Sequence, residues 1–181
     1  MSAHAHLMST GMGPLFDGST HFLLSPEDLV PAFGLALFAG LRGAEYGRRL
    51  LLALPCAWLL GAVLGLGAAA TTGSGVVSAV WLLLIGGLVA ADAKLTLRAA
   101  TLLATVLGLH HGYLNAAGAG YSLSSAIMLV GLAATVFVVA ALVAALVVQL
   151  RGQWTRVAIR VVGSWIAASG LLWMGWAIRG G

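Results

Sequence analysis

Six apolar segments separated by short polar stretches leave this chain few ways to fold. Only 8% of its 181 residues are charged and 61% are hydrophobic, whereas a soluble domain carries about 25% charged residues. A transmembrane helix needs about 20 apolar residues. We therefore expect an all-α integral membrane protein, a bundle of about six transmembrane helices in one domain covering residues 13–181. The predicted spans are residues 27–41, 50–70, 76–91, 99–116, 124–149 and 157–178.

The basic residues predict how the bundle is oriented. Of the nine Lys and Arg, all but Arg179 fall in or beside three alternate loops. Cytoplasmic loops are enriched in Lys and Arg, so these loops are predicted to be cytoplasmic and both termini periplasmic, in a bacterial inner (plasma) membrane. The eight residues are Arg42, Arg48, Arg49, Lys94, Arg98, Arg151, Arg156 and Arg160.

Several classes of function are disfavoured by the same pattern. The basic residues form no run that could track the phosphates of a nucleic acid, so membrane lipid is the expected environment. We find no nucleotide-binding loop and no nucleophile–base pair, so we expect neither an enzyme nor nucleotide-driven transport. Asp92 is predicted to be an interfacial charge, Glu45 to form a loop ion pair, and Cys56 to be a buried, inert thiol.

The first span is short, and the segment before it is unusual. Residues 27–41 would form a helix of roughly 23 Å, less than the roughly 30 Å of a bilayer core. The preceding stretch, residues 14–24, is apolar enough to enter the membrane. We predict a short re-entrant or interfacial helix there, with a break at Ser25-Pro26. Broken helices within membranes often mark binding sites.

Ionisable residues away from the basic loops are the candidates for function, because charge inside a membrane is costly. The predicted topology brings them into the outer half of the bundle, and imidazole with carboxylate is a ligand set for divalent transition metals. Asp17 and His21, four residues apart, would share a helix face. The candidate metal ligands are His21, His111 and Asp17, with His110 and Asp28 in support.

Each candidate also has a structural interpretation. Ser25-Pro26 followed by acidic residues is typical of a helix start, which would explain Asp28, and a histidine within a helix often serves in packing. His110 and His111 point about 100° apart on a helix, so we expect one of them to be the main metal ligand. We favour His111, which shares a helix face with Asn115.

The first twelve residues are expected to be a flexible outer tail. Removal of Met1 would leave Ser2-Ala3-His4, whose amine, amides and imidazole suit square-planar Ni(II) or Cu(II). With His6 behind it, this tail could capture a metal ion outside the cell; the alternative is a tail without a metal-binding role.

Glycines should set how closely the helices pack. Gly61 and Gly65 are four residues apart, as are Gly108 and Gly112, and such small-residue pairs let helix backbones approach each other. The alternative is that these glycines line a transport pathway.

Four segments resemble the HupE/UreJ family, and the resemblance extends over nearly the whole chain. Pro14, Gly18 and His21 match the family's first-helix motif, with Asp17 as the available carboxylate. His111 and Gly112 match its second motif, in which Asn115 stands for a His and Gly118 for a Glu. The segments are residues 13–18, 21–29, 108–115 and 160–168.

The resemblance implies a small membrane protein associated with nickel or cobalt uptake, often for hydrogenase or urease. We therefore predict a secondary transporter for a divalent transition metal, nickel or cobalt, although the ligand types also suit copper and zinc. The alternative is a non-transporting subunit that anchors or assembles a metalloenzyme. Such a subunit could also hold haem between His21 and His111.

Overall fold

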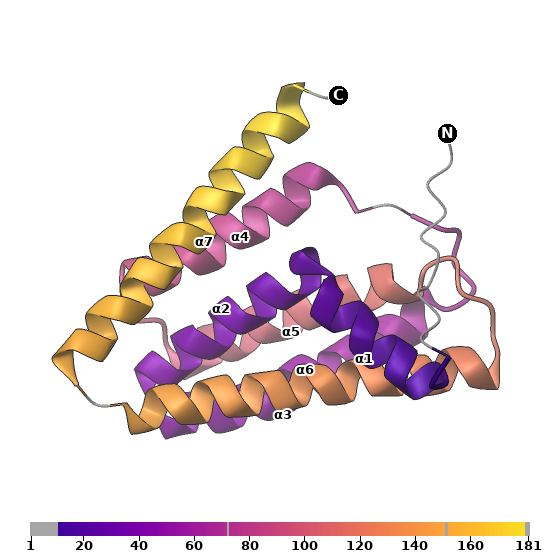
Figure 1. Cartoon of the computed structure of the whole chain (residues 1–181), viewed down its shortest axis with the longest axis horizontal. Helices are drawn as coiled ribbons and strands as arrows, with labels where there is room; N and C mark the ends of the chain where they lie inside the picture. Colours follow the sequence, from indigo (N-terminus) through magenta and orange to yellow (C-terminus); the bar gives the residue numbers. More distant parts are fainter. Residues whose placement is uncertain (1–10, 72, 151, 180–181) are drawn as a thin grey trace.

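The computed structural model describes residues 11–71, 73–150 and 152–179, and the regular structure in these ranges is entirely helical. The helices pack side by side as a bundle, with α4 and α7 forming a pair along one side (Figure 1). They are α1 (Pro14–Leu24), α2 (Pro26–Arg42), α3 (Ala44–Gly65), α4 (Gly75–Ala90), α5 (Leu97–Ala116), α6 (Leu123–Gln149) and α7 (Gln153–Arg179).

The predicted break before the first span is confirmed. Helices α1 and α2 meet at Ser25 with a bend of 75°, and Ser25 itself is extended, with φ −96° and ψ 96°. Pro26 disfavours a helical conformation at the residue before it and suits the first position of the next helix, where no N–H is needed. The sequence Ser25-Pro26 therefore ends one helix and starts another.

The prediction of six spans is not confirmed. Within the described residues, three helices are long and apolar enough to cross a membrane, namely α3, α6 and α7, and the bent pair α1 and α2 makes up to four. Helix α4 is apolar but has only 16 residues, or about 24 Å at 1.5 Å per residue. Helix α5 has 20 residues and includes Arg98, two histidines and Asn115, which lower its apolarity.

The connections between α2 and α3, α4 and α5, and α6 and α7 gather at one end of the molecule, which we call the basic end (Figure 1). The second span was predicted to begin at residue 50, but α3 begins at Ala44. Arg48 and Arg49 therefore belong to α3 and not to a loop. Glu45 also lies in its first turn and has no ion pair in the described part of the chain, so the predicted loop ion pair is wrong.

Asp92 at the basic end is more than an isolated interfacial charge. Its Oδ1 pairs with Arg42 at the end of α2, and its Oδ2 lies 2.5 Å from the guanidinium of Arg156 near the start of α7. One carboxylate thus ties two helix ends to the connection between α4 and α5.

Glycines bring α3 and α5 into backbone contact, as predicted. A Cβ on Gly61 or Gly65 would overlap the carbonyls of Leu109 or Tyr113, and a Cβ on Gly112 would overlap the carbonyl of Trp58. Glycines also allow backbone contact between α1 and α6, at Gly18 and Gly131, and between α4 and α7, at Gly86 and Gly163. Three helix pairs therefore pack at the distance that only glycine allows.

Large apolar side chains remain exposed on the outer faces of the long helices, for example Leu60 on α3, Leu142 on α6 and Leu172 on α7. Lipid would cover these faces. Cys56 is exposed on α3 as well, so the expectation of a buried thiol is wrong: the buried face of α3 is occupied by Leu54, Trp58 and Gly61.

The close α3–α5 contact can be tested with one added methyl group. Gly61→Ala should destabilise the protein by about 1–3 kcal/mol, the usual cost of overpacking, because the new Cβ would overlap the Leu109 carbonyl. Gly87→Ala on α4 is the control, since nothing lies within 4 Å of its Cβ, and it should be neutral or stabilising. Thermal unfolding in detergent measures both, and equal effects would contradict the packing described here.

Candidate functional site

A buried carboxylate, Asp28, lies at the centre of the candidate site. It stands in the first turn of α2 and is only 2% exposed. Its Oδ1 lies 2.7 Å from Nδ1 of His111, and its Oδ2 accepts a hydrogen bond of 3.0 Å from Nδ2 of Asn115. Both carboxylate oxygens are therefore paired inside the bundle, as a buried charge requires.

The partners of Asp28 are positioned by helix geometry. His111 and Asn115 are four residues apart on α5, so they face the same direction. The Oδ1 of Asn115 accepts a hydrogen bond of 3.3 Å from the indole nitrogen of Trp58 on α3. A continuous polar network thus links α2, α5 and α3, and it fixes which way the Asn115 amide points.

Aromatic rings surround this network. The ring of Trp58 lies 5.4 Å from that of His111, and the ring of Trp81 on α4 lies 6.4 Å from it. Phe22 on α1 packs edge-on against Trp58 at 5.8 Å. Helices α1, α3 and α4 therefore enclose the polar groups in apolar material, which strengthens the electrostatic interactions among them.

His110 lies beside His111, with the two rings 5.1 Å apart and nearly perpendicular. Nδ1 of His110 and Nε2 of His111 are both buried and have no hydrogen-bond partner within the described residues. Buried polar atoms nearly always have a partner, so these two nitrogens are the unsatisfied polar atoms of the candidate site within the described ranges.

The pairing with Asp28 determines what His111 can do. An ionised carboxylate only accepts hydrogen bonds, so Nδ1 of a neutral His111 is the donor and Nε2 carries the free lone pair. Histidines that bind metal ions usually donate their other ring N–H to a carboxylate in this manner. With Asp28 ionised and His111 neutral, this geometry leaves Nε2 of His111 as an electron-pair donor.

The structure brings together some of the predicted site residues and not others. Asp28, His111 and His110 meet, whereas Asp17 and His21 are half-buried on α1, and no hydrogen bond or ion pair joins His21 to Asp28 or His111. No group of three or more His, Cys, Asp or Glu in the described ranges is placed to hold a metal ion. The predicted tail ligands His4 and His6 lie outside the described residues.

Sequence reasoning missed the two tryptophans of the site. Trp58 and Trp81 lie in the middle of apolar spans, whereas membrane tryptophans are usually enriched at the interfaces. A tryptophan in the middle of a predicted span was therefore the signal in the sequence that could have identified them. The helix-start interpretation of Asp28 is also incomplete: the residue is in the first turn of α2, but its side chain pairs with α5.

Asp28→Asn should destabilise the protein by about 1–3 kcal/mol, the cost of leaving a buried hydrogen-bonding group unpaired. The amide that replaces the carboxylate has one oxygen in place of two, so it cannot accept hydrogen bonds at both of the positions that face His111 and Asn115. Glu27→Gln is the matched control, because the neighbouring carboxylate is exposed and should tolerate the same change. Thermal unfolding in detergent compares the two, and an Asp28→Asn variant as stable as Glu27→Gln would contradict the network.

Comparison with known proteins gives one match. A family model described as HupE / UreJ protein matches residues 1–173. No curated protein and no solved structure gave a match.

Proposed function

The chain belongs to the HupE/UreJ family, and from this premise we propose that it is a secondary transporter for a divalent transition metal ion. The family is associated with nickel and cobalt transport, so nickel is the proposed substrate and cobalt the second choice. Imidazole nitrogen suits both ions, and also copper and zinc.

The observation that carries this proposal is the free Nε2 of His111. It is buried, it has no partner in the described part of the chain, and the opposite ring nitrogen lies 2.7 Å from Asp28. Asp28 then orients His111 and balances the charge of a bound cation. Nδ1 of His110, also buried and unpartnered, is the second proposed donor.

Few protein ligands suit a transport site. A permeating ion must bind well enough to enter and weakly enough to leave. Two imidazoles with water in the remaining positions would meet that condition better than a closed ligand set. His21 and Asp17 on α1 stay as proposed ligands for the entering ion, because α1 reaches the site through Phe22 against Trp58.

We propose an orientation from the charge distribution and, with the site near the outer side, an inward direction of transport. With the basic end in the cytoplasm, the site lies in the outer half, since Asp28 is at the start of α2 and His111 in the last third of α5. The ion would then enter from the periplasm across a bacterial inner membrane. We propose that an ion gradient or a partner supplies the energy, without a nucleotide.

Metal uptake by cells tests the proposal. His111→Ala should reduce nickel accumulation by tenfold or more, roughly the loss expected when a metal ligand or its orienting group is removed, and His110→Ala should also lower it. Glu45→Gln, an exposed change at the basic end, is the control. Accumulation is measured by elemental analysis and normalised to the folded protein in the membrane. Unchanged uptake in His111→Ala would overturn the proposal.

His21→Ala separates two versions of the site. A loss of uptake places α1 in the metal path, and wild-type uptake confines the site to α2 and α5. The alternative of a haem-binding anchor subunit remains a prediction, and the visible spectrum of the purified protein would show the haem absorption band that it requires.

A further inference from the structure

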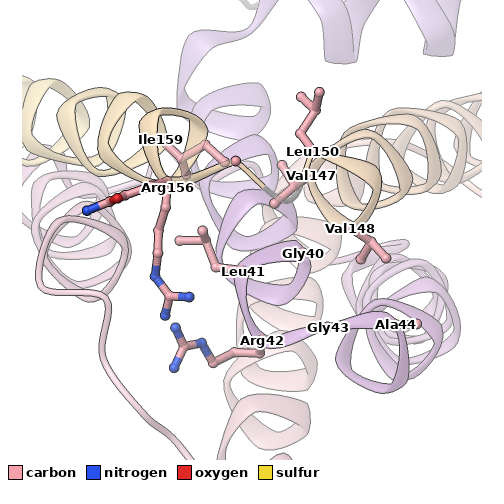
Figure 2. A pocket seen from close by; sticks show the side chains of 12 residues that line it. Gly40, Leu41, Arg42, Gly43, Ala44, Val147, Val148, Leu150, Arg156 and Ile159 are labelled. Carbon is pink, nitrogen blue, oxygen red and sulfur yellow. The ribbon is translucent and has the colours of Figure 1, made fainter.

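A pocket of about 590 Å³ opens at the basic end, far from Asp28 and His111. It lies where the end of α2, the start of α3, the end of α6 and the start of α7 meet (Figure 2). Arg42 and Arg156 form its polar side, and their guanidinium groups point toward each other. Its other walls are apolar and include Leu41, Val147, Val148 and Leu150.

The polar side of this pocket carries excess positive charge. Asp92 is the shared carboxylate of both arginines, so one negative charge faces two positive ones. Lys94 adds a third cation in an adjoining cavity of about 300 Å³ that both arginines also line. The group as a whole therefore attracts anions.

Arg42 supplies an independent sign of a missing partner. Its side chain is only 9% exposed, and its Nε is buried without a hydrogen-bond partner in the described part of the protein. A guanidinium offers its donors in a planar fork that fits a phosphate group. The unpartnered donor on the pocket wall thus favours an anionic acceptor.

Two helix starts and two helix ends meet at the pocket, so their opposite dipoles largely offset each other and the arginines supply the positive charge. Helix α3 begins at Ala44 without a side-chain cap, and α7 begins at Gln153; both residues line the pocket. Helix N-termini carry partial positive charge and free N–H groups.

We propose that this pocket binds the phosphate group of an anionic phospholipid from the cytoplasmic leaflet. The phosphate contacts the guanidinium donors of Arg42 and Arg156 that Asp92 leaves free, and the acyl chains follow Val148 and Leu150. The apolar wall continues onto the outer surface at the end of α6, where Leu146 is 57% exposed and Leu150, just after the helix, is 47% exposed. A free phosphate ion would leave this wall and most of the volume unused, whereas basic pockets between membrane helices suit anionic headgroups.

Native mass spectrometry of the full chain in detergent tests the proposal by titration with phosphatidylglycerol, phosphatidylcholine or inorganic phosphate. Phosphatidylglycerol should bind about tenfold more tightly than phosphatidylcholine, as expected for a charge-assisted contact. Arg156→Gln should abolish this preference, because Arg42 and Asp92 then neutralise each other. Arg156→Lys keeps the positive charge but not the planar guanidinium, and it should retain part of the preference for phosphatidylglycerol.

Arg98→Gln is the matched control, since Arg98 is an exposed arginine of the basic end that does not line the pocket. It should bind phosphatidylglycerol as the wild type does. Equal losses in Arg98→Gln and Arg156→Gln would show diffuse attraction and overturn the site. Inorganic phosphate that binds as tightly as the lipid would overturn the lipid assignment. Size-exclusion profiles and melting temperatures confirm that each variant is folded.

Discussion

A carboxylate buried among apolar helices is the constraint on which the rest of this structure depends. Removing a charge from water costs several kcal/mol unless partners replace the water. Asp28 obtains them from His111 and Asn115 on α5, and Trp58 on α3 completes the network. These contacts require α2, α3 and α5 to hold fixed distances and rotations. Gly112 meets that requirement next to His111, because its missing side chain lets α5 touch the backbone of Trp58.

Helix α2 joins the two polar regions of the molecule. It carries Asp28 in its first turn and Arg42 at its last position, and the residues between them, from Ala32 to Gly40, are largely buried. A shift of α2 along its axis would disturb both the hydrogen bonds of Asp28 with α5 and the ion pair of Arg42 with Asp92. One helix therefore carries a member of each of the two polar regions.

The sequence predicted those features that local rules control. Ser25-Pro26 located the helix break, the glycine pairs indicated close helix packing without saying which helices meet, and the polar face of α5 pointed to His111. Features that depend on how distant helices rotate against each other were not predictable. Asp28 and His111 are 83 positions apart, and periodicity cannot say that their faces meet. The link from Arg42 and Arg156 to Asp92 was missed for the same reason, and α3 begins earlier than predicted because a helix can continue beyond its apolar segment.

We propose that Asp28 holds His111 so that Nε2 of His111 faces a metal ion. X-ray absorption at the nickel edge, measured on the purified, nickel-loaded protein, tests it directly. We expect imidazole scattering around nickel that falls by about half in His111→Ala, because His110 remains as the second donor, while the protein stays folded. A spectrum with oxygen neighbours alone, or imidazole scattering unchanged in His111→Ala, would contradict it.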